Sequence, residues 1–275
     1  MKRGTLIYAA AVLAGVLIVA GPAGRSAQNN NGGLVDQPEI GQQNKQPQVK
    51  LSDEERADLF MVRKQYNDAL AYYSLSIKTY SGPPQNKAKI AGLRNKMGIC
   101  YQQQLEFGKA RKAFEEAIRL DRNLAPAWNN LGTCYYLEHQ AKKSIKYYRH
   151  AIKLNPDAAS FHMNLGTAYF ERKKYKPAIK EYRAAIELDP EILTRTSRQG
   201  IAVETRYADA RFYFYMAKIY ASLGNPNEAV NYLRRAMEEG FTKRKQILDD
   251  PDILKISKDP GFIALMKNPP VAIKD

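Results

Sequence analysis

Two cysteines are the first residues whose chemistry the sequence must explain. Cys100 and Cys134 are 34 positions apart, a separation that would place them on adjacent copies of one structural unit. A disulfide needs Cα atoms within about 7 Å, whereas stacked helices lie about 8–10 Å apart. We therefore interpret both as small buried residues, and a chain with only two cysteines cannot form a four-cysteine zinc site.

Three histidines could bind a metal or transfer protons, but their spacing argues against both roles. We expect His162 to be a partly buried packing residue, His139 to lie near a helix turn and His150 to lie on an outer helix. The sequence also lacks the G-x-S-x-G, P-loop, G-x-G-x-x-G and H-E-x-x-H motifs. We therefore predict a protein that is not an enzyme, with no catalytic residues, no cofactor and no metal. A buried pair of carboxylates in a cleft would favour an enzyme instead.

A row of lysines is a candidate binding surface. Lys112, Lys146 and Lys180 are spaced by 34 residues, so they would form a ladder on the outside of a repeat array. Arg149 and Arg183 form a second row, which Glu115 interrupts. Such a face could attract anionic lipid, a glycan or an acidic protein. The alternative is ordinary solvated charge.

The overall charge gives a weaker signal than the lysine row. The chain has 275 residues with 43 Lys and Arg against 28 Asp and Glu, a formal net charge of +15. This excess divides into +2 over residues 1–49, +9 over 50–192 and +4 over 193–275. Nothing resembles the basic tail typical of nucleic-acid-binding proteins. We expect a diffuse positive surface and no nucleic-acid partner.

Self-similarity at a fixed period predicts the elements that would position these residues. Three consecutive windows carry the same residue types at the same offsets. They are Arg94, Met97, Gly98, Tyr101, Ala110, Phe114 and Ala117; Trp128, Leu131, Gly132, Tyr135, Ser144, Tyr148 and Ala151; and His162, Leu165, Gly166, Tyr169, Ala178, Tyr182 and Ala185. Their spacing predicts two helices per window, and Asn155-Pro156 and Asp189-Pro190 should end the second one. A pair of helices cannot bury its own apolar face, so neighbouring pairs must stack.

These residues resemble the tetratricopeptide repeat, whose 34-residue pattern is W-x2-L-G-x2-Y…A-x3-F…P. The resemblance is strong over residues 91–192 and weaker on either side. The copies are residues 50–83, 91–124, 125–158, 159–192 and 210–243. In the last copy Ala217 replaces the glycine and Phe241 stands in place of the proline. The resemblance implies an all-α solenoid of about five repeats that binds a protein or peptide partner.

The same resemblance implies which side chains would face a ligand. In such repeats they come from the first helix, at positions off the packing face. In this sequence they are Asn95, Ile99, Gln102, Asn129, Thr133, Tyr136, Met163, Thr167, Phe170, Phe214 and Lys218. A mixed set of amides, hydroxyls and apolar groups suits an extended or helical peptide.

Some members of the family bind the terminal carboxylate of a chaperone through a Lys/Asn/Arg clamp. Asn130 and Asn164 match the amide part of that clamp. Ser160 and Asn164, however, stand where the cations would be needed in the next repeat. The missing cations argue against that class of ligand.

The first part of the chain reads as an export signal followed by a linker. Lys2 and Arg3 precede the apolar run Leu6–Ala20, which is 15 residues long. That length is typical of a secretory signal and short for a spanning helix of about 20 residues. We expect residues 1–27 to be a signal peptide or an N-terminal membrane anchor, and residues 28–49 to be a Gln/Asn-rich flexible linker. The rest of the chain would then lie outside the cytoplasm, in the periplasm or another extracytoplasmic space.

Two further segments flank the last repeat. Leu193–Tyr207 is an insertion that we interpret as a tolerated surface excursion, with a functional loop as the alternative. Asp250-Pro251 and Asp259-Pro260 each pair an N-cap residue with a proline at the first helical position. They predict two short helices within residues 244–275 that cap the solenoid.

The function predicted from the sequence is a non-catalytic scaffold of the cell envelope that holds a peptide or protein in its concave groove. The alternative is a protein that docks on an anionic membrane surface or polymer through a basic convex face. Neither the partner nor the oligomeric state follows from the sequence.

Overall fold

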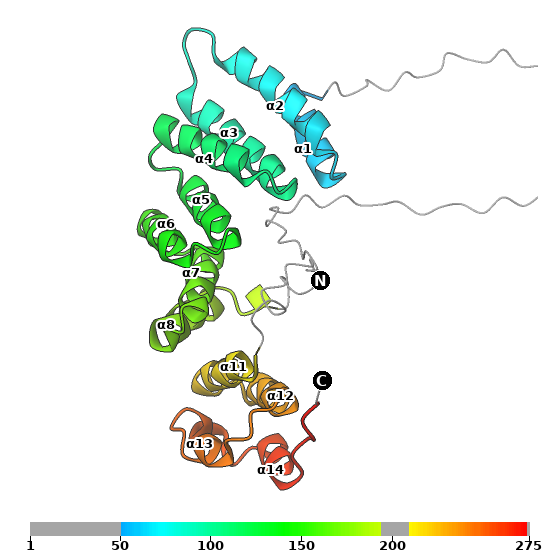
Figure 1. The fold of residues 1–275 in the computed structure, drawn as a ribbon, viewed down its shortest axis with the longest axis vertical. Helices are drawn as coiled ribbons and strands as arrows, with labels where there is room; N and C mark the ends of the chain where they lie inside the picture. The colour runs from blue at the N-terminus through cyan, green and yellow to red at the C-terminus, as the bar shows by residue number, and fades with distance from the viewer. Residues whose placement is uncertain (1–50, 194–208, 274–275) are drawn as a thin grey trace, which may run out of the picture.

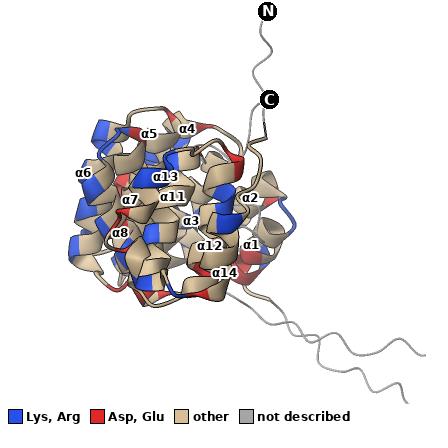
Figure 2. Ribbon diagram, turned by 90° about the horizontal axis from the view of Figure 1, so that it is seen from below, with Lys and Arg blue, Asp and Glu red and all other residues tan. Residues whose placement is uncertain are grey.

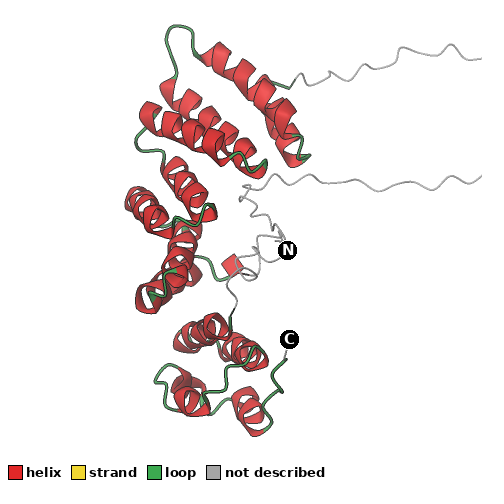
Figure 3. Ribbon diagram, in the orientation of Figure 1, coloured by secondary structure: helices red, strands yellow, loops and turns green. Residues whose placement is uncertain are grey.

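A computed structural model describes residues 51–193 and 209–273, and within those ranges all regular secondary structure is helical (Figure 3). The long helices come in pairs joined by short turns. They are α1 (Asp53–Val62) with α2 (Tyr66–Tyr80), α3 (Lys87–Gln103) with α4 (Phe107–Leu120), α5 (Ala125–Leu137) with α6 (Ala141–Leu154), α7 (Ala159–Glu171) with α8 (Tyr175–Leu188), and α11 (Ala210–Ser222) with α12 (Pro226–Glu238). Shorter elements follow: α13 (Arg244–Leu248), the 3-10 helix η1 (Ile253–Ile256) and α14 (Pro260–Lys267).

The pairs stack one after another into an arc (Figure 1). α2 packs on α3, α4 on α5 and α6 on α7, and the first helices α3, α5 and α7 also contact one another. α5 and α7 lie on the inner side of the arc, while α6 and α8 lie on its outer side (Figure 1). The predicted all-α solenoid is thus confirmed.

Glycines set the spacing between the two helices of a pair. A Cβ atom added to Gly132 would lie 2.8 Å from Cδ1 of Tyr148, and one added to Gly166 would lie 2.7 Å from Cδ1 of Tyr182. Both distances are shorter than ordinary carbon contacts of about 3.5–4.0 Å. The glycines predicted to allow close helix approach therefore each accommodate a buried aromatic ring.

The ends of the helices also follow the sequence. α6 and α8 end before Asn155 and Asp189, which have extended backbone angles and precede prolines, as predicted. Each turn between paired helices contains one residue with a left-handed backbone. These residues are Lys64 (φ 59°), Leu105 (φ 62°), His139 (φ 60°), Lys173 (φ 58°) and Gly224 (φ 74°). Only in the last pair is that position the glycine that this conformation favours.

The junction between α8 and α11 is less regular than the others. α8 contacts α11 less extensively than α6 contacts α7, although Phe212 continues the apolar core by packing edge-on against Phe170 and Tyr182. Apart from Leu193, the predicted insertion lies outside the described residues. So do the predicted signal or anchor at 1–27 and the linker at 28–49.

The C-terminal segment packs on the last helix pair, but its elements differ from the two predicted helices. Asp259 caps α14 by accepting the backbone N–H of Phe262 at 3.0 Å, as expected. The segment after Asp250-Pro251 forms only the 3-10 helix η1, and α13 was not predicted. Asp250 accepts the N–H groups of two residues at the start of η1, so it acts as a cap for a shorter element.

Both cysteines are free and completely buried. Burial raises the pKa of each thiol to about 12, so both thiols are protonated at neutral pH and unreactive. Cys100 and Cys134 are therefore packing residues, as the sequence indicated. No helix in the described ranges has the length and apolarity needed to cross a membrane.

Candidate functional site

A chain of four asparagine amides runs across the first helices on the inner side of the arc. Asn164 on α7 donates its Nδ2–H to Oδ1 of Asn129 on α5 at 3.0 Å, and Asn129 donates to Asn130 at 3.3 Å. Asn130 in turn donates to Oδ1 of Asn95 on α3 at 3.0 Å. We call these four residues the amide chain. It links three repeats because residues 35 positions apart face each other on adjacent first helices.

The amide chain has unused hydrogen-bonding groups. A carboxamide carries two N–H donors and two acceptor lone pairs, and each internal member of the chain uses one donor and one acceptor on its neighbours. Asn95, Asn130 and Asn164 are half-buried, whereas Asn129 is 7% exposed. The three half-buried amides can therefore offer hydrogen bonds to a ligand while their side chains are held in place by the chain.

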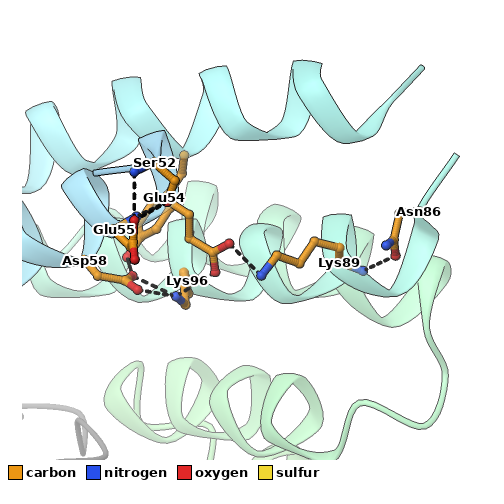
Figure 4. Close-up of polar contacts among 8 residues, drawn as sticks. Ser52, Glu54, Glu55, Asp58, Asn86, Lys89 and Lys96 are labelled. Atoms are coloured by element: carbon orange, nitrogen blue, oxygen red, sulfur yellow. Dashed lines mark hydrogen bonds and ion pairs between the residues drawn. The ribbon is translucent and has the colours of Figure 1, made fainter. Parts of the chain in front are cut away.

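Charged residues join the first helices of the first two pairs, α1 and α3 (Figure 4). Lys96 on α3 lies 2.7 Å from Oδ2 of Asp58 and 3.1 Å from Oε1 of Glu54, both on α1. Lys89 reaches the other oxygen of Glu54 at 2.6 Å, and Tyr73 donates its hydroxyl to Asp58 at 2.6 Å. These contacts hold α1 against α3. They also mean that the cation of Lys96 is already neutralised.

The ion pairs shift the titration of this cluster. Burial by itself would raise the pKa of Glu54, but hydrogen bonds from Lys89 and Lys96 outweigh it, and the pKa of Glu54 lies below its usual value. The same hydrogen bond raises the pKa of Lys89. Both groups are therefore charged at neutral pH, and their attraction contributes to the fold.

Two of the predicted ligand-facing residues instead accept hydrogen bonds from buried tyrosines of their own repeat. Tyr148 donates its hydroxyl to Thr133 at 3.2 Å, and Tyr182 donates to Thr167 at 3.3 Å. A buried hydroxyl needs a partner, and burial also raises the pKa of both tyrosines. This pairing is visible in the sequence, because a threonine lies 15 positions before each of these two tyrosines.

The second repeat supports this explanation. Phe114 has no hydroxyl to satisfy, and the residue 15 positions before it is the apolar Ile99. In the first repeat the pattern returns, since Tyr73 donates to Asp58 15 positions earlier. Thr133, Thr167 and Ile99 thus vary with the aromatic residue of their own repeat, a packing signal that was visible in the sequence.

Several other predicted residues are buried. Gln102 is 4% exposed and accepts a contact from the thiol of Cys134, and Met163 is 2% exposed in the apolar core. Phe170 is 6% exposed because it packs against the next repeat at Phe212. Asn129 lies inside the amide chain. This differs from the expectation that they face a ligand, because each packs against the neighbouring repeat.

The C-terminal segment covers the last two predicted residues. Phe214 is 1% exposed, because the ring of Phe241 stacks on it with centroids 4.3 Å apart. Lys218 pairs with Oδ2 of Asp250 at 2.7 Å. Both residues were predicted to face a ligand. In the structure Phe214 instead packs against Phe241 at the end of its own repeat, and Lys218 pairs with Asp250 of the capping segment. One hint was visible in the sequence, where Phe241 replaces the proline that follows α6 and α8 in the two preceding repeats.

Of the predicted set, Asn95, Tyr136 and Thr133 are half-buried on the inner side and keep some exposed surface. Asn130 and Asn164 join them, although they were noted only as part of a clamp and not among the ligand-facing positions. Their common signal was the asparagine that recurs 34 residues apart. Their partners could not be found that way, because the contacts cross between repeats at a spacing of 35.

His162 is a packing residue, as predicted. Its Nε2 lies 2.9 Å from the carbonyl oxygen of Pro156, where the indole of Trp128 one repeat earlier donates to Arg122 at the same distance. Its Nδ1 lies 2.7 Å from a carboxylate oxygen of Glu181 on α8. Both ring nitrogens are thus occupied by contacts that hold the repeat together.

On the outer side, Lys112, Lys146 and Lys180 are all exposed. They lie at equivalent positions of α4, α6 and α8, as the spacing predicted. None of the three forms an ion pair within the described ranges. Whether they bind an anionic partner stays a prediction.

Models of known families match the repeats directly. One tetratricopeptide repeat model matches residues 125–158 and 159–192, and a second matches residues 91–124 and 210–239. A search among curated proteins gives no significant match.

Solved structures resemble the chain at low identity. MamA is 22% identical over 66% of this chain and 93% of that chain, with a TM-score of 0.45. YrrB, described as a TPR protein with an unusual peptide-binding site, is 19% identical over 75% of this chain and 90% of that chain, with a TM-score of 0.44. BtubC from P. vanneervenii is 17% identical over 67% of this chain and 77% of that chain, with a TM-score of 0.49. From the family models, residues 91–192 and 210–239 of this chain are tetratricopeptide repeats.

Proposed function

We propose that this protein is a non-catalytic scaffold that binds a peptide or protein partner along the inner face of its solenoid. The observation that carries the proposal is the amide chain. Its members come from three successive first helices and are fixed by their mutual hydrogen bonds. Preorganised side chains lose little entropy when a ligand binds.

The chemistry of the amide chain suits a peptide backbone. An extended peptide alternates N–H donors and C=O acceptors, and a carboxamide can pair with either. Tyr136, a half-buried residue of α5, would add aromatic surface for a side chain of the ligand. Repeating amides along the inner face would thus bind the main chain, and their neighbours would select its side chains.

A carboxylate-terminated ligand is not the one we propose. Lys96, which follows Asn95 in the sequence, already contacts Glu54 and Asp58. Lys218 on α11 is paired with Asp250. A free carboxylate would have to compete with these buried or half-buried acids for each cation.

Peptide selection against the full chain tests the proposal. Peptides selected from a displayed library are synthesised, and their affinities are measured by fluorescence anisotropy. Asn130→Ala and Asn164→Ala should each weaken binding by about 3- to 10-fold, because one neutral hydrogen bond contributes about 0.5–1.5 kcal/mol. Asn231→Ala, an exposed position on α12, is the matched control and should leave affinity unchanged.

The double variant provides the result that would overturn the proposal. If the selected peptides bind the Asn130→Ala/Asn164→Ala double variant as tightly as the natural chain, the amide chain is not the binding site. Thermal melting of each variant must accompany the affinities, because these amides also bond to one another.

We also propose that the chain works in the cell envelope, exported or anchored by residues 1–27. The support is the sequence alone, in which Lys2 and Arg3 precede the apolar run Leu6–Ala20. Expression followed by cell fractionation tests this. Recovery of the chain in the cytoplasm, at its full mass, would rule it out.

A second candidate function is docking on an anionic surface, favoured by one observation. Every fully exposed side chain of α6 is Lys or Arg, namely Lys142, Lys143, Lys146, Arg149 and Lys153. Loss of retention on an anionic resin after reversal of these charges would support it. Retention equal to that of the natural chain would not.

A further inference from the structure

The outer surface around α6 holds most of the excess charge of the chain. Residues 141–180 contain ten Lys and Arg residues but only two acidic ones, Asp157 and Glu171. This short stretch therefore supplies a net charge of +8 out of +15. Figure 2 shows this charge over α6 and α8, the helices on which the sequence predicted two members of the lysine row.

These cations come from the two outer helices α6 and α8 and from the turn before α8. α6 contributes the five exposed cations named above, and the turn before α8 contributes Arg172, Lys173 and Lys174, all exposed. The start of α8 adds exposed Lys176 and Lys180. We call these ten residues the basic face. Figure 2 shows Lys and Arg gathered over α6 and α8, whereas acidic residues gather near α1 and α14.

The cations of the basic face differ from several cations elsewhere that are paired with a carboxylate. Lys89, Lys96, Arg111 and Lys218 each contact a carboxylate from another helix or from the capping segment. In the described ranges no member of the basic face makes such a contact. Like charges held this close repel one another, so the surface is suited to a counter-charge supplied from outside the chain.

The shape of the basic face favours a broad anionic surface over a small anion. The charges lie on exposed positions of a helix and a turn, where long lysine side chains spread over the outside of the arc. Lys142, Lys146, Arg149 and Lys153 follow one side of α6 at helical spacing. No exposed aromatic residue of α6 offers a platform on which nucleic-acid bases could stack.

The basic face and the amide chain lie on different helices. The amide chain belongs to α3, α5 and α7, whereas the basic face belongs to α6 and α8 and the turn before α8. α5 and α7 lie inside the arc and α6 and α8 outside it (Figure 1). A surface bound by the basic face would therefore leave the inner face open.

We propose that the basic face docks this chain on a bilayer of anionic phospholipid, with the inner face turned away from the membrane. The anchor, one of the two predicted forms of residues 1–27, favours a lipid partner because it would hold the folded part close to a bilayer. The availability of the inner face to a peptide rests on the proposed scaffold function. The membrane contact rests on the second candidate function, docking on an anionic surface, and names that surface.

Vesicle co-sedimentation of the full chain tests the proposal. Vesicles of phosphatidylcholine alone are compared with vesicles containing phosphatidylglycerol, so that any insertion of the apolar leader is common to both. The variant Lys142→Glu/Lys146→Glu/Lys153→Glu should bind the anionic vesicles at least about 100-fold more weakly, since each basic side chain near such a surface contributes roughly fivefold. Raising the salt concentration should weaken the binding of the natural chain as well.

A matched control reverses three exposed cations away from the basic face. Lys78→Glu/Arg234→Glu/Lys267→Glu changes the net charge equally, and these residues lie on α2, α12 and α14. This variant should keep most of its vesicle binding. If it loses as much as the basic-face variant, or if the natural chain binds both vesicle types equally, the proposal is overturned.

Two further measurements test whether the partner is a lipid and whether the inner face points away from the membrane. Binding of the natural chain to polyglutamate but not to anionic vesicles would overturn the lipid assignment in favour of an acidic polymer. A peptide selected on the inner face should bind the basic-face variant with unchanged affinity, and its binding to vesicle-bound protein should match that in solution. Loss of peptide affinity on vesicles would overturn the proposed orientation.

Discussion

Replacing Gly132 by alanine tests whether contacts between glycine and an aromatic ring set the spacing of paired helices. The new Cβ atom would lie 2.8 Å and 2.9 Å from two ring carbons of Tyr148, and 3.3 Å from the carbonyl oxygen of Ser144. The ring is 1% exposed, so it cannot swing into solvent. Either the ring or the whole of α6 must move.

The change in the free energy of unfolding combines two destabilising contributions with one stabilising contribution. Overpacking a core costs about 1–3 kcal/mol. A displaced Tyr148 also loses its hydrogen bond to Thr133, 3.2 Å long, which contributes about 1 kcal/mol. Alanine regains up to about 1 kcal/mol through its higher helix propensity. We expect the free energy of unfolding to fall by about 2 kcal/mol, which lowers Tm by about 4–8 °C in a chain of this size.

The last repeat supplies a natural rescue for this variant. There Ala217 takes the place of the glycine and Leu233 takes the place of the ring, and both are completely buried. The double variant Gly132→Ala/Tyr148→Leu should therefore be more stable than the two single changes predict, by about 1–2 kcal/mol in a double-mutant cycle. Urea unfolding of the four proteins measures this coupling.

Gly92→Ala is the matched control, because a Cβ atom at Gly92 would meet nothing within 4 Å. That change should raise stability by up to about 1 kcal/mol through helix propensity alone. Two results would refute this explanation: a higher Tm for Gly132→Ala, or no coupling between Gly132→Ala and Tyr148→Leu in the double-mutant cycle. Either would mean that the contact between Gly132 and the ring of Tyr148 does not set the spacing of α5 and α6.

Three further predictions concern a turn, the capping segment and the effect of pH. Lys64→Gly should raise Tm by about 2–4 °C, because Lys64 is exposed with φ 59° and a non-glycine residue strains that conformation by about 1 kcal/mol; an unchanged melting curve would contradict this. Asp250→Ala should lower Tm by about 4–8 °C in calorimetry, because it removes the partner of Lys218 and two backbone hydrogen bonds worth about 2 kcal/mol together. The weaker contact of Asp252 with Lys218, at 3.9 Å, makes Asp252→Ala its control. Because the pKa of Glu54 is lowered from its usual 4.5 in the folded state, its stabilisation is present above pH 4.5 and lost as the pH falls through the folded value. The natural chain should therefore be more stable than Glu54→Gln at pH 7, and the difference should shrink on acidification; a difference that is constant with pH would contradict the assignment.

Much of the fold follows from the sequence because its signals are local. Gly132 and Tyr148 identify a close helix pair through their types and spacing alone. Asn155-Pro156 identifies a helix end, since a residue before proline avoids the α conformation. Both statements concern a single repeat, and the structure agrees with them.

The C-terminal segment shows where local signals fail. Asp250-Pro251 predicted a helix, but the chain forms only a 3-10 turn there before α14. Asp250 is drawn instead into a contact with Lys218 on α11, far away in the sequence. The position of Asp250 therefore depends on how the capping segment packs against α11. A pattern of neighbouring residues in the sequence cannot predict that packing.

The exposure of first-helix residues was likewise decided by tertiary structure. The family resemblance implied that Phe214 and Lys218 face a ligand, but Phe241 and Asp250 cover them. Asn130 on α5 donates to Asn95 on α3, 35 residues earlier in the sequence. Which side chains remain open depends on what the next repeat or the capping segment places over them.

The sequence by itself thus determined the period, the helix pairs and the residues within each pair that must touch, because a repeat folds by contacts between residues close in sequence. Only the tertiary structure decided which asparagines join into one chain and which of the predicted ligand-facing side chains a neighbouring repeat covers. Those arrangements arise from the stacking of separate repeats, in which the curvature of the solenoid brings one set of side chains together and spreads another over the outside.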